Sequence, residues 1–285
     1  MANQRAPAFQ ESPWPILRNA LVSYLDTKRT HPVSGFVELD VTDALEALHQ
    51  AQRRLRIAVS FHAFMIYCLA QALMEHPTML QFRKGKKLIR FEDIDVMTPI
   101  EKKLAGGVRI PVAYIVRAAQ KKSLADVNWE LRSAIRAEDL PNDEAIRLRR
   151  RFAAMPSLVR KFLTWRARTD PFLFKKLHGT VLLTNVQTHG FQNSAAVLGP
   201  TVHTLSMGVG SMTNRLKLNE RNEVVNRKML MLSGTADHEI VDGMIATRFI
   251  ARLTKLVESG AGVNGDFVAE MRSRFSAEGE SESAG

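Results

Sequence analysis

An apolar strand that leads directly into an amphipathic helix, over residues 228–256, constrains the fold of this 285-residue chain more than any other segment. Lys228–Ser233 has the pattern of a buried strand, and the following apolar residues recur at helical spacing: Ile245, Phe249, Leu253 and Leu256. His238 falls between the two elements, where rigid neighbours can hold it towards a cleft. Because an unperturbed imidazole has a pKa of about 6.5, this position suits proton transfer at neutral pH.

Two interpretations of this junction are open. His238 can be a loop histidine with ordinary partners, and Asp242 can be only the N-cap of the following helix. The pattern His-x-x-x-Asp-Gly over residues 238–243, preceded by Asp237, resembles the active-site signature of the dihydrolipoamide acyltransferase catalytic domains of 2-oxoacid dehydrogenase complexes. Chloramphenicol acetyltransferases share the core of that family.

The resemblance covers residues 14–140 and 178–260. Its segments are an opening helix at 16–22, strands at 34–40, 106–112 and 179–185, helices that begin near 41 and 123, and a buried helix from 60 that ends before Pro77. It implies a fold of the α/β (α+β) class, a chloramphenicol acetyltransferase-like two-layer sandwich in which helices cover a mixed β-sheet.

The resemblance also implies roles for individual residues. His238 would be the base that deprotonates an incoming group, and Thr184 stands where the family has a serine whose hydroxyl stabilises the tetrahedral oxyanion. Thr184 can equally be a β-branched residue that simply favours a strand. Asp242, followed by Gly243, would pair with Arg18 and fix the loop, although Arg18 can also be a solvated helix residue. Next to Thr184, Asn185 is a weaker candidate for orienting backbone or substrate.

Coenzyme A and its thioesters are the substrates that this resemblance implies. The family forms trimers with each active site between two subunits, and larger dehydrogenase cores are built from them. Because the catalytic resemblance begins by residue 14, no lipoyl domain is expected before it and no lipoyl group bound to this chain. We therefore favour a catalytic domain that transfers acyl groups to another acceptor. The alternatives are an acyltransferase core served by a separate lipoyl carrier protein, and a non-catalytic trimeric scaffold.

Three regions are expected along the chain. Residues 1–13 form an N-terminal arm, residues 14–265 the catalytic domain, and residues 266–285 a C-terminal segment that is mostly a disordered tail. Within the catalytic domain, residues 141–177 depart from the family as a basic helical insertion. Its pattern predicts one amphipathic helix broken near Pro156 and a second short segment after Pro171.

Positive charge gathers in this insertion, because residues 147–176 carry ten arginines and lysines against the single acid Asp170. Three interpretations are open. The apolar stripe can cover the domain or a neighbouring subunit while the arginines stay solvated. The arginines can instead bind phosphates of coenzyme A, or an acyl or lipoyl carrier protein. An arginine-rich face backed by Phe, Leu and Trp165 can also contact a membrane surface.

Composition narrows the remaining function classes. The net charge of +11 first points to nucleic acid, but we find no zinc-finger spacing, no ribonucleoprotein motif and only three Trp and three Tyr. The eight histidines lack metal-ligand spacing, so no metal is expected. Gly208-Val209-Gly210 is not a dinucleotide fingerprint and indicates a tight strand or a bulge.

The single cysteine, Cys68, lies in an apolar helix and is expected to be a buried structural thiol. Residues 1–15 lack the apolar core of a secretory signal, and the longest apolar stretch, 61–74, is too short to span a bilayer. These features predict a cytoplasmic protein.

Overall fold

The core of the molecule is a six-stranded sheet with the strand order β1-β8-β7-β6-β4-β5. In this computed structural model, residues 14–16, 18–25, 30–103, 109–136, 151–186, 193–197 and 199–283 are described. The strands are β1 (Pro32–Asp40), β4 (Val96–Lys103), β5 (Arg109–Val116), β6 (Val181–Asn185), β7 (Leu205–Leu218) and β8 (Val224–Asp237). Since β6 is parallel to β4 and β7 whereas the other pairs are antiparallel, the sheet is mixed, as the family resemblance implied.

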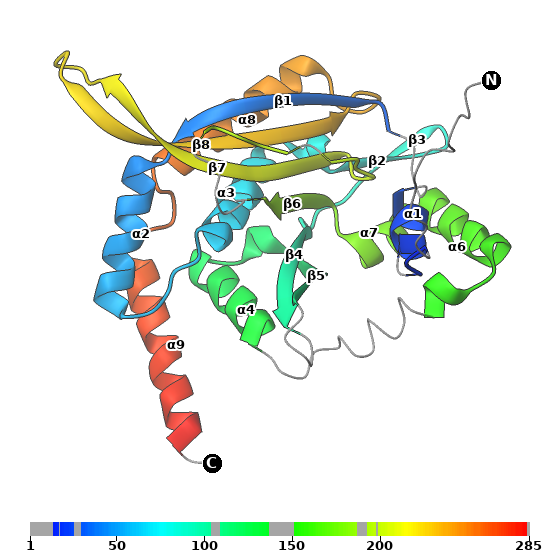
Figure 1. The fold of residues 1–285 in the computed structure, drawn as a ribbon, viewed down its shortest axis with the longest axis horizontal. Coiled ribbons are helices and arrows are strands. Elements are labelled where there is room, and N and C mark those ends of the chain that lie inside the picture. The colour runs from blue at the N-terminus through cyan, green and yellow to red at the C-terminus, as the bar shows by residue number, and fades with distance from the viewer. Residues whose placement is uncertain are drawn as a thin grey trace, which may run out of the picture.

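Helices form the second layer of the sandwich (Figure 1). They are α2 (Thr42–Leu55), α3 (Phe61–Glu75), α4 (Leu124–Arg136), α8 (Gly243–Glu258) and α9 (Gly265–Ser283). Helix α3 is the central one because it packs against both α4 and α8, and Ser60 caps it by accepting a hydrogen bond from the Ala63 amide. Val181 and Leu183 of β6 are in the core, whereas Leu182 and Thr184 alternate with them and face the other side of the sheet.

Gly208 and Gly210 are required where residues 193–197 cross β7. A Cβ on Gly208 would lie 2.6 Å from the Ser233 hydroxyl oxygen, and one on Gly210 would clash with the Ala195 carbonyl oxygen. The pairing of β7 with β8 also shifts register between Val209 and Met212. The strand-and-bulge interpretation of this glycine pair is therefore confirmed.

The basic insertion contains α6 (Ser157–Thr169) and α7 (Pro171–His178), separated at Asp170, and a helical segment over 151–154 ends before Pro156. The predicted breaks are therefore present, and residues 141–150 lie outside the described residues. Helix α6 packs on α1 (Arg18–Leu25) and on α7. Helix α7 in turn packs on β2 (Gln81–Lys84), which forms a separate hairpin with β3 (Lys87–Arg90). Two short 3-10 helices, Pro77–Leu80 and Ala119–Lys121, complete the chain.

The C-terminal segment differs from the expected disordered tail, because α9 continues to Ser283. Phe267 and Met271, four residues apart on one face, are both buried in the core and hold the start of this helix. Arg274 then binds Asp126 of α4 and Glu270. Once the start of a helix is anchored, each further residue adds a backbone hydrogen bond and only a small loss of conformational entropy. The polar sequence alone did not indicate that the segment is anchored in this way. The expected N-terminal arm, residues 1–13, lies outside the described residues.

The buried Cys68 and the partly buried His62, both on α3, have perturbed pKa values. Burial raises the pKa of the Cys68 thiol, which agrees with a structural role. Burial lowers the pKa of His62 to about 4, and its Nε2 lies 2.6 Å from the Thr98 hydroxyl oxygen. Within the described residues, no helix combines the length and hydropathy needed to cross a membrane.

We expect His62 to make the protein less stable in acid. Because its folded pKa is below the unfolded value, the unfolded chain binds more protons, so stability falls as the pH drops from about 6.5 towards 4. Relative to pH 8, the expected loss at pH 5 is about 2 kcal/mol. Urea unfolding of the wild type and His62→Gln across this range should show a shallower pH dependence for the variant. The exposed His49→Gln serves as the control, and equal pH dependence of all three proteins would contradict the assignment.

Candidate active site

His238 follows the last residue of β8 and is exposed, while its backbone is fixed by neighbouring strands. Its amide donates a hydrogen bond to the His31 carbonyl oxygen over 2.8 Å, and the Asp237 amide donates to the Thr204 carbonyl oxygen over 2.9 Å. The buried Asp237 carboxylate accepts hydrogen bonds from the amides of His31 at 3.1 Å and Glu239 at 3.3 Å. The imidazole of His238 is thus exposed to solvent, while hydrogen bonds to His31 and Thr204 fix the backbone of residues 237–238.

Arg83 adds a further connection to this loop. Its guanidinium forms an ion pair with the Glu239 carboxylate, which joins the β2–β3 hairpin to the residue after His238. Side chains of His31, Asp237 and Glu239 also place ligand-type atoms within 4.8 Å of one another. The Asp237 carboxylate accepts backbone hydrogen bonds and the Glu239 carboxylate is paired with Arg83. We call His31, Asp237, Glu239 and Arg83 the His238 frame.

Sequence reasoning did not assign the frame a role. Asp237 was visible as the acid before His238, whereas no pattern in the sequence marked His31. Their contact depends on the pairing of Pro32 with Asp237 at the ends of β1 and β8, about 200 residues apart in the chain. No local pattern of residue types encodes such a contact.

Asp242 is the N-cap of α8, since its carboxylate accepts a hydrogen bond from the Ile245 amide over 2.9 Å. Gly243 is the first residue of that helix and has open space where a Cβ would be. Arg18 lies on α1 with its guanidinium 5.8 Å from the Trp14 ring centroid. The ion pair between Arg18 and Asp242 is not among the contacts of the described residues, because α1 packs against α6.

Thr184 and His238 are far apart within one chain. Thr184 of β6 pairs with Gly208 of β7, and Gly208 pairs with Ser233 of β8. His238 follows Ser233 by five residues. Two strand spacings are about 10 Å and five extended residues about 17 Å, so the two Cα atoms are separated by about 20 Å. One carbonyl carbon cannot be reached by both side chains of the same chain. Asn185 is exposed beside Thr184, at the end of β6.

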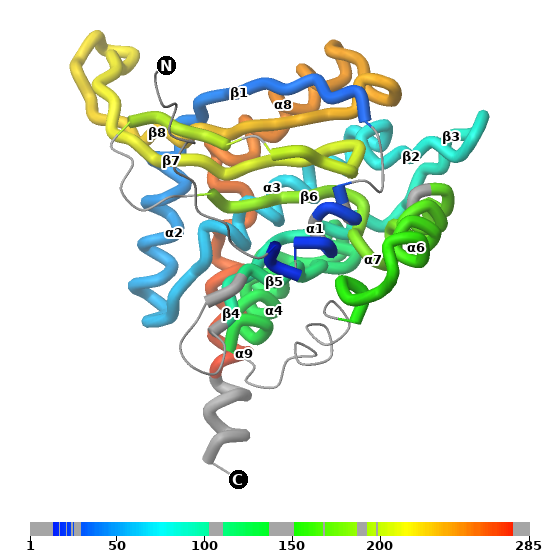
Figure 2. The backbone as a smooth tube through the Cα atoms, turned by 45° about the vertical axis from the view of Figure 1, so that its right-hand side comes forward, coloured from blue at the N-terminus to red at the C-terminus, as the bar shows by residue number. Residues whose placement is uncertain are grey.

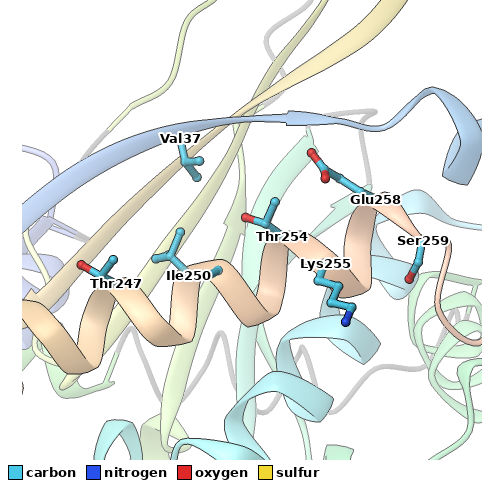
Figure 3. Close-up of a pocket in the computed structure, with 8 residues that line it drawn as sticks. Val37, Thr247, Ile250, Thr254, Lys255, Glu258 and Ser259 are labelled. Carbon is cyan, nitrogen blue, oxygen red and sulfur yellow. The ribbon is translucent and has the colours of Figure 1, made fainter. Parts of the chain in front are cut away.

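A groove of about 650 Å³ runs between the edge strand β1 and helix α8. Thr247, Ile250 and Thr254 of α8 point towards Val37 of β1, and Lys255, Glu258 and Ser259 line its far end (Figure 3). None of the candidate catalytic residues lines it, and the Glu258 carboxylate accepts a hydrogen bond from the Asp40 amide over 3.0 Å. This groove is therefore separate from the His238 site.

Residues 162–263 match the family described as 2-oxoacid dehydrogenases acyltransferase (catalytic domain). This part of the chain is similar to the catalytic domains of the 2-oxoacid dehydrogenase acyltransferases. The matched range includes β6 with Thr184, both long strands, and the whole segment from Asp237 to Gly243. The resemblance on which the sequence analysis relied is thereby confirmed over residues 162–263.

A curated relative is the dihydrolipoyllysine-residue acetyltransferase component of the pyruvate dehydrogenase complex of Rickettsia felis. It is 24% identical over 226 residues, which are 78% of this chain and 45% of that protein. The chain therefore spans less than half the length of this relative.

Solved structures extend the likeness over nearly the whole chain. A probable dihydrolipoamide acetyltransferase from Listeria monocytogenes is 19% identical, with a TM-score of 0.63 over 90% of this chain and 97% of that one. The dihydrolipoamide acetyltransferase of Azotobacter vinelandii is 17% identical, with a TM-score of 0.60 over 92% of this chain and 99% of that one. These likenesses establish the acyltransferase fold for the parts that lie outside residues 162–263.

Proposed function

We propose that this chain is a coenzyme A-dependent acyltransferase in which His238 is the general base. The observation that carries the proposal is the exposed imidazole at the end of β8, on a backbone fixed by the His238 frame. A free thiol has a pKa of roughly 8.5, so a neutral imidazole can accept its proton near neutral pH. A side chain that must reach a reacting thiol gains from this rigid support.

The Azotobacter enzyme supports these roles by its residue types. A serine, a histidine and an asparagine were investigated in its catalytic mechanism, and that histidine and asparagine are four positions apart. His238 and Asp242 have the same spacing here. For Asp242 we propose a supporting role, because it fixes the start of α8 and thereby the loop that carries His238.

We further propose that the working site forms between two copies of the chain in a homotrimer. The separation of about 20 Å between Thr184 and His238 means that a second copy must supply one of the two groups. Thr184 is on the face of the sheet opposite the core helices, and partly buried, so a neighbouring subunit can approach it. The relatives belong to dehydrogenase complexes, which gives this assembly precedent.

The reaction then follows from the chemistry of these groups. His238 takes the proton of the acceptor, whose heteroatom forms a bond to the thioester carbonyl carbon. The carbonyl oxygen becomes an oxyanion that accepts a hydrogen bond from the Thr184 hydroxyl. As the tetrahedral intermediate collapses, the carbon–sulfur bond breaks and the imidazolium returns the proton to the departing thiolate of coenzyme A.

The test is release of free coenzyme A from a set of acyl-coenzyme A thioesters, followed by chromatography. Acceptors to include are dihydrolipoamide, amines, alcohols and other thiols, since the relatives act on a lipoyl-lysine residue. We expect turnover with one thioester and acceptor class, and dihydrolipoamide turnover would identify a separate lipoyl carrier as the partner. A trimeric, folded protein that turns over none of these pairs would support the non-catalytic scaffold instead.

Variants at Thr184 test the oxyanion donor separately. Thr184→Val keeps the shape of the side chain but removes the hydroxyl, and we expect kcat to fall about a hundredfold with little change in KM. Thr184→Ser restores the family's residue and should keep activity within a few-fold of the wild type. Steady-state kinetics on proteins with matched circular dichroism spectra provide the measurement. Wild-type kcat in Thr184→Val would remove the hydroxyl from the mechanism.

A further inference from the structure

Helix α6 turns an apolar ridge away from the rest of the chain. Leu158, Phe162 and Trp165 occupy one side of the helix and are 77%, 61% and 55% exposed. The opposite side holds the helix to the protein, since Ala167 is buried and the Arg160 guanidinium donates to the carbonyl oxygens of Ala153 and Met155 at 2.9 and 2.7 Å. This part of the insertion's apolar stripe therefore does not cover its own domain.

The β2–β3 hairpin lies near α6 at the same end of the molecule (Figures 1 and 2). Helix α7 joins the two. Phe172 of α7 meets the Phe91 ring edge-on at 5.7 Å between centroids, and the Lys84 ammonium is 5.6 Å from the Phe172 centroid. Deeper in the same contact, Phe174 packs on Phe82 at 5.2 Å. Helix α7 thus packs on both α6 and the hairpin, so the three elements are contiguous.

Cations surround the exposed apolar groups on this surface. The hairpin carries five cations and no acid between residues 81 and 90, together with the exposed Leu88. On α6 and α7, the only acid between residues 151 and 178 is Asp170, which is bound to Arg166 and caps α7. We call the following exposed residues the basic-apolar surface: Lys84, Lys86, Lys87, Leu88, Leu158, Lys161, Phe162, Trp165, Phe172 and Lys176.

We propose that the basic-apolar surface binds peripherally to an anionic phospholipid bilayer. A helix with large apolar and aromatic residues on its outer side and lysines around them suits the boundary between headgroups and acyl chains. Lysine stems can pass along that boundary while their ammonium groups reach lipid phosphates. Anionic headgroups supply the charge that the surface lacks.

Other occupants fit this surface less well. A second copy joined through the same surface would bring like charges together, which is unfavourable across a symmetric contact. An acidic carrier protein would complement the charge of the lysines. It would have no matching groove for the three large side chains of the ridge, Leu158, Phe162 and Trp165, which project from a convex helix. A bilayer accepts such a convex ridge without any matching shape.

The basic-apolar surface is also connected to the catalytic loop. Arg83, which pairs with Leu88 near the turn of the same hairpin, binds Glu239 next to His238. A docked membrane would therefore lie beside the candidate active site, which suits an acyl donor or acceptor held in lipid. This last step rests on the proposed acyl transfer, whereas the membrane contact does not depend on it.

Vesicle flotation tests the contact independently of catalysis. We expect the full chain to float with phosphatidylcholine vesicles that contain about 30% phosphatidylglycerol, and binding should weaken at least tenfold in pure phosphatidylcholine or in about 0.5 M NaCl. Lys86→Glu/Lys87→Glu should weaken binding about 20-fold or more. Leu158→Ser/Phe162→Ser/Trp165→Ser should weaken it about tenfold or more, because the ridge no longer enters the interface.

The β7–β8 hairpin at the other end of the molecule offers matched controls (Figure 2). Lys217→Glu/Arg221→Glu changes the same number of exposed cations, and Leu216→Ser/Leu218→Ser/Val224→Ser removes exposed apolar groups. Both should float like the wild type. Equal losses in the two hairpins would overturn the proposal in favour of general charge attraction. Loss of the oligomer in the ridge variant, measured by light scattering, would assign the ridge to a second copy, and vesicle binding unchanged in that variant would also overturn it.

Discussion

Replacing His238 with alanine is expected to reduce the release of coenzyme A by about 100- to 10,000-fold, the range that a general base contributes. The fold should be retained, because the His238 side chain is exposed and its hydrogen bond to His31 uses the backbone amide, which alanine keeps. Burst and steady-state kinetics with the best thioester and acceptor pair provide the measurement. KM should change little, since the base acts on the transition state rather than on binding.

His49→Ala is the control for this substitution, because His49 is an exposed histidine on α2, away from the candidate site. It should retain wild-type kinetics. If His238→Ala and His49→Ala were equally active, the assignment of the base would be wrong. If both lost activity, the effect would come from folding or assembly and not from proton transfer.

Mixing two inactive variants should restore activity if the site forms between copies. His238→Ala supplies an intact Thr184, and Thr184→Val supplies an intact His238. When equal amounts are unfolded together and refolded, random trimers should contain both intact groups in about a quarter of their sites. Activity is therefore expected to return to about a quarter of the wild-type value, far above either variant alone.

Two comparisons make the mixing result decisive. The double variant His238→Ala/Thr184→Val, refolded with either single variant, cannot assemble a site with both groups and should stay inactive. Differently tagged chains, purified through both tags, show that mixed oligomers have formed. Mixed oligomers without recovered activity would mean that Thr184 and His238 do not act in one shared site.

The strand–helix junction at His238 could be predicted because each part has a local signal. The apolar run before Ser233 and the helical spacing from Ile245 to Leu256 depend only on neighbouring residues. Pro156 and Pro171 likewise marked breaks in the insertion, since proline removes a backbone donor wherever it occurs. The mixed two-layer fold came from the family resemblance rather than from local patterns.

Contacts between distant segments were not accessible in this way. The His238 frame depends on the register of β1 against β8, and the course of α9 depends on Phe267 and Met271 reaching the core. The helical spacing of Leu158, Phe162 and Trp165 shows that the helix is amphipathic. The spacing does not show whether the apolar face contacts protein or solvent. The Arg18 and Asp242 pair, taken from the resemblance, is replaced within the chain by a helix cap and a ring contact.

The position of His31 at the start of β1 has a consequence for how the site is lost. β1 is an edge strand whose first residues are exposed, and it pairs with β8 on one side only. Local unfolding of its first residues would break both hydrogen bonds between His31 and the segment 237–238 while leaving the buried core intact. The candidate site is therefore expected to lose its geometry when the first residues of β1 unfold, so that inactivation precedes global unfolding.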